Sequence, residues 1–129
     1  MNVVGVGVDL VELERIRDAI DRYGDRFLHR IYSEEEREVA RAKTDAVPYL
    51  AGRFAAKEAI SKSLGTGVSG AMSWTELQVL SEPSGQPTVT LLGESAEVAR
   101  RAGVGKVLLS ISHGRDLAIA HAIAIRADG

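Results

Sequence analysis

Apolar and small side chains alternate along the first stretch of the chain, from Val3 to Leu10, with the two-residue period of a β-strand. Val4, Val6, Val8 and Leu10 build one large apolar face, and the opposite face carries Val3, Gly5, Gly7 and Asp9. Because the two glycines leave that face without side chains, another backbone or a ligand can approach it closely. Asp9 would then direct its carboxylate toward that space or, alternatively, cap the helix that follows.

The next part of the chain changes to a helical period, with apolar residues three and four positions apart from about Val11 to Arg30. Gly24 predicts a break or bend in this helix. A second, short helix is expected after Ser33, a favoured capping residue that precedes three glutamates, and should end near Lys43. The residues that the first helix would bury are Leu13, Ile16, Ile20, Tyr23 and Phe27.

A longer helix is predicted from about Pro48 to about Leu64. Proline is tolerated in the first turn of a helix, and Gly65 and Gly67 can adopt the left-handed conformations that end one. We interpret this helix as the chemical centre of the chain, because polar residues interrupt its apolar face. That face contains Leu50, Phe54 and Leu64, with Ala51 and Ala55 beside them.

Glu58 and Ser61 fall within this apolar face. A carboxylate there loses hydration unless a positive charge, a metal ion or a solvent-filled cleft compensates it. Lys62 follows Glu58 by one helical turn, in the favourable orientation for an ion pair. A common surface pair between these two residues is therefore the simple alternative to a functional site.

The last third of the chain predicts a hairpin, a short helix and two further strands. His113, at a strand end beside a tight turn, is either accessible for binding or an ordinary turn residue. His121 interrupts the last strand, where packing and one hydrogen bond explain it. The alanine side of that strand could pack closely against another backbone or subunit. The predicted elements are strands Thr75–Leu80 and Thr88–Leu91, helix Glu94–Ala102, and strands Lys106–Ser112 and Leu117–Ile125.

Composition narrows the class of protein. A chain of 129 residues is expected to form one domain, and the absence of cysteine excludes disulfides, thiolate nucleophiles and cysteine-based zinc sites. A formal net charge of −2 and few aromatic residues argue against general nucleic-acid binding. The N-terminal stretch lacks a basic leader, and no apolar run approaches the length of a membrane span. We therefore expect a soluble cytoplasmic protein that does not bind membranes.

Asp9, Glu58, Lys62 and His113 share a common chemistry. Two carboxylates can hold a magnesium ion while leaving positions for water and phosphate oxygens. Lysine and histidine can neutralise the remaining phosphate charge. The glycines that follow the central helix do not match P-loop or Rossmann loops, which precede their helices, so a different kind of phosphate site is needed.

The sequence resembles the acyl-carrier-protein synthase family of phosphopantetheinyl transferases in three separated segments. Two positions differ from the usual pattern of that family, because Leu117 replaces a frequent aromatic residue and Gln86 a frequent basic one. The matching segments lie in the family's order across nearly the whole chain. They are Gly5 to Glu12 followed by Arg15-Ile16, then Arg53 to Ala59 with Lys62 and Gly65-Thr66-Gly67, and finally Ser110 to His113.

The resemblance implies a small single α+β domain, residues 1–129, with a mostly antiparallel sheet packed on helices. It also implies transfer of 4′-phosphopantetheine from coenzyme A to a serine of apo acyl carrier protein, with release of adenosine 3′,5′-bisphosphate. By the same resemblance, Asp9 and Glu58 would bind Mg²⁺, and Glu58 would be a candidate to accept the serine proton. Catalysis would then fall to Asp9, Glu58 and Lys62, and coenzyme binding to Arg53, Lys57, Ser61, Lys62, Gly65 and His113.

The resemblance also implies a homotrimer with its sites between subunits, the Asp9 of one chain meeting the Glu58 of the same chain or of its neighbour. Arg15, Arg22 and Arg26 would then dock the acidic carrier protein. From the residues alone, these arginines are more typical of a solvated helix of mixed charge than of a docking surface. Two other functions remain as alternatives, a non-catalytic module that binds coenzyme A or a nucleotide, and a trimeric interaction domain without a ligand.

Overall fold

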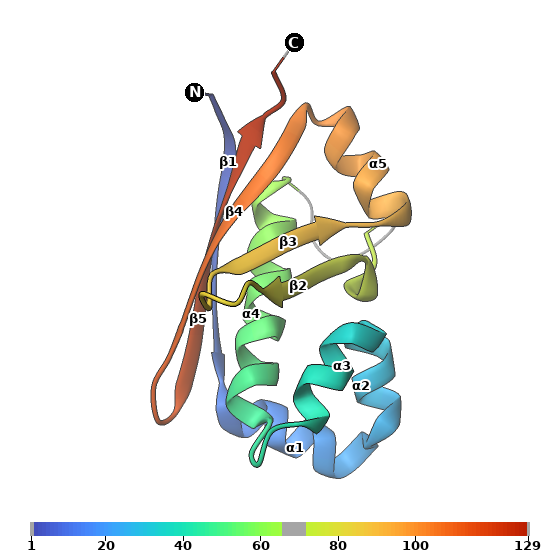
Figure 1. Ribbon diagram of the computed structural model, residues 1–129, viewed down its shortest axis with the longest axis vertical. Coiled ribbons are helices and arrows are strands. Elements are labelled where there is room, and N and C mark those ends of the chain that lie inside the picture. Colours follow the sequence, from blue (N-terminus) through green and yellow to red (C-terminus); the bar gives the residue numbers. More distant parts are fainter. Residues whose placement is uncertain (1, 66–71, 129) are drawn as a thin grey trace.

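The central feature of the fold is helix α4, Val47–Ser63, which lies across one face of a three-stranded antiparallel sheet (Figure 1). The computed structural model describes residues 2–65 and 72–128. The other helices are α1 Leu13–Tyr23, α2 Asp25–Ile31, α3 Glu34–Arg41, α5 Gly93–Arg101 and the short 3₁₀ helix η1 Trp74–Glu76. The strands are β1 Val3–Glu12, β2 Leu77–Ser81, β3 Pro87–Leu91, β4 Val104–His113 and β5 Leu117–Arg126.

The strands form two antiparallel sheets, which confirms the predicted α+β class. The larger sheet has the order β1-β5-β4, and β2 pairs with β3 in a separate hairpin. Asp9 of β1 lies opposite Ala120 of β5, which in turn lies opposite Ile111 of β4. The side chains of these three residues share one face of the sheet, and His113, two residues after Ile111 at the end of β4, lies on the same face in the next row, opposite Ala118.

Small residues allow α4 to approach the sheet closely. A Cβ atom added at Gly5 would collide with the carbonyl oxygen of Ser63, and one added at Gly7 with that of Ala59. The expectation that a backbone approaches this glycine face is therefore confirmed, and the backbone is that of α4. The alanine side of β5 faces the same helix and is almost completely buried, through Ala118, Ala120, Ala122 and Ala124.

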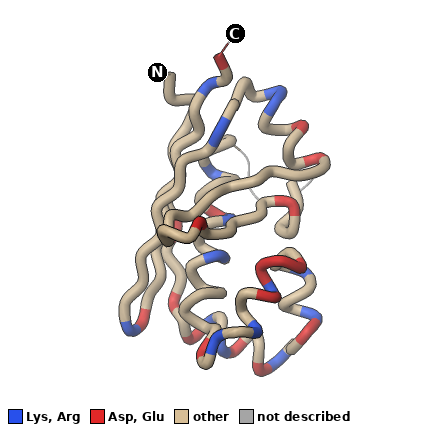
Figure 2. The backbone as a smooth tube through the Cα atoms, in the orientation of Figure 1, with Lys and Arg blue, Asp and Glu red and all other residues tan. Residues whose placement is uncertain are grey.

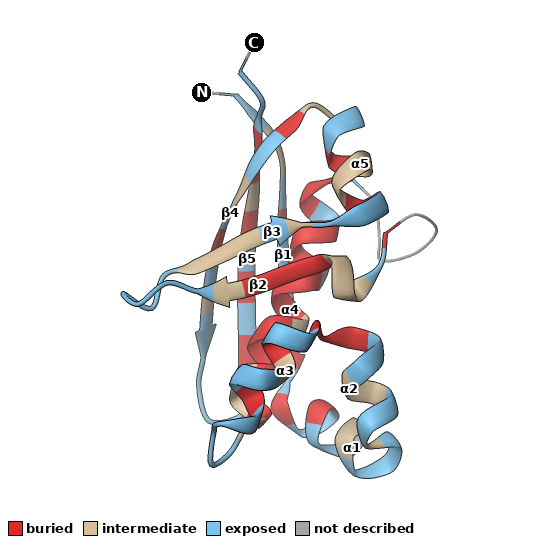
Figure 3. Cartoon of the chain, turned by 45° about the vertical axis from the view of Figure 1, so that its right-hand side comes forward, coloured by how far each residue is buried: buried red, intermediate tan, exposed pale blue. Residues whose placement is uncertain are grey.

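The opposite face of the larger sheet is apolar and exposed, as the pale blue segments of its strands show (Figure 3). Its large apolar side chains are between 41 and 60 % exposed. No element among the described residues covers them, so the big apolar face that the alternation of β1 predicts is not the core of the single chain. We call this surface the outer sheet face and define it by Val6, Val8, Leu10, Leu108, Leu117 and Ile119.

Strand β1 continues two residues further than the pattern predicts, so a helix start at Val11 is wrong. Val11 and Glu12 pair with Ala118 and Leu117 of β5, which extends the ladder. Asp9 therefore lies within a strand, which excludes the alternative that it caps α1. The predicted break at Gly24 is confirmed, because this residue has φ 55° and separates α1 from α2.

The ends of α3 and α4 follow the local signals. Ser33 and Glu36 form a reciprocal capping box, in which Ser33 Oγ accepts from the amide of Glu36 and Glu36 Oε1 accepts from the amide of Ser33. Pro48 lies in the first turn of α4, and Gly65 follows its end with φ 81°. Thr66 and Gly67 lie outside the described residues. Within the described part of the chain, no helix has the length and apolar character needed to cross a membrane.

Candidate active site

Asp9 and Lys62 meet where β1 crosses the C-terminal half of α4. Asp9 shares the inward face of β1 with Gly5 and Gly7, so its carboxylate points toward the helix. Lys62 Nζ lies 3.1 Å from Asp9 Oδ1 and donates a second hydrogen bond of 3.1 Å to the carbonyl oxygen of Val8. Lys62 thus forms its ion pair with Asp9 across the helix–strand contact, and not with Glu58 as in the simple alternative of a surface pair.

Glu58 lies close enough to this pair to interact with it electrostatically. Partial burial raises the pKa of Glu58, the negative charge of Asp9 raises it further, and the positive charge of Lys62 opposes both. Asp9 and Glu58 therefore come together within one chain. The periodicity of α4 indicated that Glu58 lies within an apolar helix face, where its carboxylate would lose hydration. The raised pKa of Glu58 agrees, because desolvation by burial is its largest cause.

The donor chemistry of Asp9 and Glu58 fits a magnesium ion. Magnesium prefers oxygen ligands, and proteins commonly supply only one or two carboxylates while substrate phosphates and water complete the shell. A bound divalent cation would also relieve the repulsion that raises the pKa of Glu58. Across residues 2–65 and 72–128, no group of three or more acidic, histidine or cysteine side chains that could hold a metal ion gathers.

The charge coupling around Glu58 predicts opposite shifts in two variants. Asp9→Asn should lower the pKa of Glu58, because it removes a repelling negative charge, and Lys62→Met should raise it. The pKa of Glu58 is higher in the folded state than in the unfolded state. Ionisation of Glu58 therefore lowers the stability of the protein as pH rises from the unfolded-state pKa to the folded-state pKa. Carboxyl ¹³C NMR titration of the metal-free protein measures the pKa directly. A Glu58 titration that is identical in the parent and both variants would contradict the coupling.

A cleft of 750 Å³ opens on the other side of α4, toward β4, and two of the expected coenzyme residues line it. Arg53 is held there by hydrogen bonds from Nε to the carbonyl oxygen of Val79, 3.4 Å, and from Nη2 to Ser81 Oγ, 2.7 Å. His113 lines the same cleft from the end of β4. We call this cavity the β4 cleft; Asp9, Glu58 and Lys62 are not among its lining residues.

Two further residues of the β4 cleft escaped the sequence analysis. The ring of Tyr49 lies 4.3 Å from the guanidinium carbon of Arg53, and Lys43 Nζ lies 5.2 Å from the same ring. Burial raises the pKa of Tyr49, whose hydroxyl group has no hydrogen-bond partner among the described residues. The available signal was the spacing of Tyr49 and Arg53, which are four positions apart and so share one face of α4.

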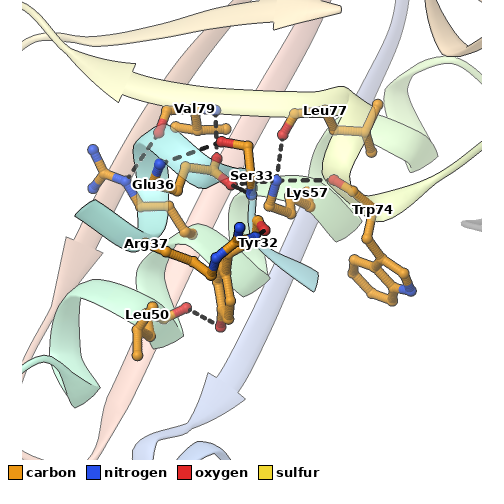
Figure 4. A network of polar contacts seen from close by, with 10 residues as sticks. Tyr32, Ser33, Glu36, Arg37, Leu50, Lys57, Trp74, Leu77 and Val79 are labelled. Atoms are coloured by element: carbon orange, nitrogen blue, oxygen red, sulfur yellow. Dashed lines mark hydrogen bonds and ion pairs between the residues drawn. The ribbon is translucent and has the colours of Figure 1, made fainter. Parts of the chain in front are cut away.

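Lys57 and Ser61 do not reach the surface, although both were expected to contact coenzyme A. Lys57 is fully buried, and its ammonium group is 2.9 Å from Glu36 Oε1 and donates to the carbonyl oxygens of Trp74 and Leu77 (Figure 4). Desolvation lowers the pKa of Lys57, and the charge of Glu36 opposes this shift. Ser61 is also fully buried and donates to the carbonyl oxygen of Glu58. These positions argue against direct contact of either side chain with a ligand.

Gly65, also expected to contact coenzyme A, is exposed just after the end of α4. Its amide donates to the carbonyl oxygen of Lys62 at 3.0 Å, which closes the last turn of α4. The left-handed φ of 81° favours glycine at this position, and nothing lies within 4 Å of the place a Cβ atom would occupy. A ligand held by Lys62 could therefore approach this backbone closely.

The three arginines expected to dock a partner are all exposed on α1 and α2. Basic and acidic residues alternate along these helices (Figure 2). Arg26 also lines a cavity of 440 Å³ together with Arg30. We call this cavity the α2 cavity. Arg26 and Arg30 border it, and the remaining lining residues are mostly apolar, namely Tyr23, Phe27, Ile31 and Trp74.

Comparison with known proteins identifies the class to which this fold and these residues belong. The model of the 4′-phosphopantetheinyl transferase superfamily matches residues 5–122. The chain therefore belongs to this superfamily, as its three sequence segments indicated. The match includes Asp9, Glu58 and Lys62 as well as Arg53 and His113, so both groups of site residues lie inside it.

Within the superfamily, the similar proteins are holo-[acyl-carrier-protein] synthases. The synthase of Desulforudis audaxviator is 48 % identical over 123 residues, covering 95 % of this chain and 93 % of its own, and that of Koribacter versatilis is 44 % identical, covering 94 and 97 %. The synthase structure from Neisseria meningitidis superimposes with a TM-score of 0.91 at 33 % identity, covering 97 % of this chain and all of its own. The synthase from Bacillus anthracis, solved in complex with CoA (3′,5′-ADP), has a TM-score of 0.82 at 34 % identity and covers 97 and 98 %.

Proposed function

We propose that this protein is a holo-acyl-carrier-protein synthase. It transfers the 4′-phosphopantetheine arm of coenzyme A to a serine hydroxyl of apo acyl carrier protein and releases adenosine 3′,5′-bisphosphate. The observation that carries this proposal is the cluster of Asp9, Glu58 and Lys62 within one chain. The similarity to holo-[acyl-carrier-protein] synthases over almost the whole chain supports the same activity. The fold and composition are compatible with a cytoplasmic location, which we include in the proposal.

The acidic cluster suggests how the transfer proceeds. Asp9 and Glu58 would hold Mg²⁺, which supplies charge neutralisation for the pyrophosphate and polarises the attacked phosphorus. Lys62 adds a positive charge beside them and stabilises the charge that develops on the leaving phosphate. Glu58 would be the candidate to accept the proton of the attacking serine, directly or through a water molecule, because it is the partly buried carboxylate of the cluster.

Coenzyme A would be shared between two subunits. Asp9 and Lys62 lie at the β1 edge of the larger sheet, whereas Arg53 and His113 lie in the β4 cleft at the opposite edge. Helix α4 packs between these two groups: its Gly52 lines the β4 cleft together with Ile111 of β4, while its C-terminal half packs against Gly5 and Gly7 of β1. A coenzyme A molecule that contacts both groups of residues would therefore bind between two chains, where the β4 cleft of one chain meets Asp9 and Lys62 of its neighbour.

A homotrimer formed through the outer sheet face would supply that neighbour. Six large apolar side chains are exposed there on three adjacent strands, and apolar patches of this kind are typical of association surfaces. Cross-strand rows such as Leu10, Ile119 and Ser112 run across the face without a charged side chain. A second copy of the same chain offers the same apolar surface.

The acidic carrier protein would dock on α1 and α2. Arg15 and Arg22 present positive charge from α1, and Arg26 and Arg30 border the α2 cavity, whose apolar lining can receive an apolar side chain of the partner. Charged groups around such a contact mainly accelerate association and orient the partner.

Charge reversal at this surface should slow the transfer. Arg22→Glu or Arg26→Glu should reduce kcat/KM for the carrier protein by about tenfold at low ionic strength, with less salt dependence than the parent. Steady-state rates over a series of salt concentrations measure both effects. Arg101→Glu, an exposed reversal on α5, is the matched control and should leave the rate unchanged. Equal rates for the parent and both docking variants at low salt would contradict this docking surface.

The decisive test of the function is the mass of the carrier. The purified protein is incubated with apo acyl carrier protein, coenzyme A and Mg²⁺, and the intact mass of the carrier should increase by one phosphopantetheine group. The same mixture without coenzyme A is the control. Binding of coenzyme A without any mass gain would instead support the alternative of a non-catalytic binding module. If the protein shows no binding of coenzyme A and the carrier gains no mass, both functions are refuted.

A further inference from the structure

A buried ion pair between Glu36 and Lys57 lies where four segments of the chain meet (Figure 4). Both side chains are fully buried, and Lys57 Nζ lies 2.9 Å from Glu36 Oε1. All polar atoms of the pair have partners: Lys57 donates to the carbonyl oxygens of Trp74 and Leu77, and Glu36 accepts from the amides of Ser33 and Val79. The pair thus ties α3 and α4 to η1 and β2.

On one side, the pair fixes a wall of the α2 cavity. Lys57 holds the carbonyl oxygen of Trp74 at 2.9 Å. The indole ring of Trp74 stacks on Phe54, with ring centroids 5.0 Å apart, and lines the α2 cavity beside Arg26. Loss of the Lys57 bond would therefore release the backbone that sets the position of this ring.

On the other side, the pair fixes a wall of the β4 cleft through a single residue, Val79. The amide of Val79 donates to Glu36 Oε2 at 2.7 Å, and its carbonyl oxygen accepts from Arg53 Nε at 3.4 Å. Arg53 is also bonded to Ser81 of the same strand and lines the β4 cleft. The carboxylate of Glu36 thereby fixes the position of β2, whose Val79 carbonyl oxygen and Ser81 hydroxyl group accept the hydrogen bonds of Arg53.

Energetic considerations favour a positional role for this pair. The desolvation of two buried charges offsets most of their attraction, so an apolar pair of similar volume would serve the stability of the fold about as well. Four short charge-assisted hydrogen bonds to backbone groups, by contrast, hold those groups in fixed positions that apolar contacts do not specify. The feature that distinguishes this pair is therefore geometric precision rather than stability.

We propose that Glu36 and Lys57 are positioning residues, which hold the carrier-binding α2 cavity and the coenzyme-binding β4 cleft in one fixed arrangement. This inference rests on the function proposed above, because it assigns the two cavities to the two substrates. It also gives Lys57 a role that its burial allows, in place of direct contact with coenzyme A.

The test uses Trp74, the single tryptophan of the chain, as an internal reporter. Glu36→Gln preserves the size of the side chain but removes its charge, and a double variant that combines it with Lys57→Met removes both charges and avoids a buried unpaired one. Each should red-shift the emission of Trp74 and raise the KM for both coenzyme A and carrier protein by about tenfold, with kcat little changed. Thermal unfolding of each variant is measured alongside.

Leu109→Ala is the matched control, because Leu109 is a buried core residue of β4 that lines neither cavity. It should lower the unfolding temperature and leave the emission and both KM values unchanged. The proposal is overturned if Leu109→Ala raises both KM values as much as Glu36→Gln, or if the folded double variant retains the emission and both KM values of the parent. Absence of transfer by the parent would refute the proposed function instead, and Trp74 emission with calorimetric binding of coenzyme A would still decide the positioning role.

Discussion

Replacing Asp9 with Asn or Glu58 with Gln should lower Mg²⁺-dependent transfer by about a thousandfold, the loss expected when metal-assisted stabilisation of several kcal/mol is removed. Either change removes one of the two carboxylates that lie together beside Lys62. Initial rates of phosphopantetheine transfer over a range of Mg²⁺ concentrations measure the effect. Calorimetry with Mg²⁺ alone should show weaker binding in both variants.

Neither variant should unfold, which separates the loss of activity from a loss of structure. The Asp9–Lys62 pair is partly exposed, so its removal should cost about 1 kcal/mol or less. Glu58→Gln should be at least as stable as the parent above the folded-state pKa, because burial disfavours the charged form of Glu58. Glu94→Gln, an exposed change on α5, should keep the parent rate. Unchanged turnover and Mg²⁺ dependence in both site variants would refute the metal assignment.

Introducing one charge into the outer sheet face should separate the proposed trimer into monomers. Ile119 is 42 % exposed on β5, between Leu10 and Ser112 of the two neighbouring strands. Ile119→Asp would bury an unpaired carboxylate in each subunit of the assembly, at a cost of about 3 kcal/mol or more per subunit. Light scattering coupled to size-exclusion chromatography should show a monomer. Transfer should fall with the trimer, because the proposed coenzyme site needs groups from two chains.

The matched control is Leu92→Asp, which introduces the same charge at an apolar residue 42 % exposed outside the outer sheet face. This variant should retain both the trimer and the activity. A parent protein that is monomeric at assay concentrations, or an Ile119→Asp variant that remains trimeric, would contradict assembly through this face. A monomeric Ile119→Asp variant with parent activity would contradict the shared coenzyme site alone.

The helices with strong local signals were predicted closely from the sequence. The expected helix from Pro48 to Leu64 differs from α4 by one residue at each end, and Ser33 caps α3 as its sequence indicates. Both depend on backbone preferences of neighbouring residues, namely proline in a first turn and glycine or serine at an end. The extent of β1 was missed because Val11 and Glu12 fit a helix locally, and only pairing with β5 makes them a strand.

The candidate site divides in the same way. Alternation assigned Asp9 to the glycine face of a strand, and helical periodicity revealed Glu58 as a carboxylate among apolar residues; both are properties of short stretches of chain. The motif resemblance led to the superfamily that the comparisons confirm. The partner of Lys62, by contrast, depends on the crossing of β1 over α4, which joins positions more than fifty residues apart in the chain.

By itself, therefore, the sequence determined the main helices and strands, which follow from local periodicity. It also determined the superfamily, which follows from short motifs of residue types. Only the tertiary structure decided which face of the sheet is core: the glycines of β1 and the alanines of β5 face α4, and the larger apolar residues of the outer sheet face point away from it. It also decided that Lys57 is buried against Glu36 while its neighbour Glu58 approaches Asp9. The physical reason is that burial and charge pairing depend on contacts between distant segments, which periodicity along one segment cannot specify.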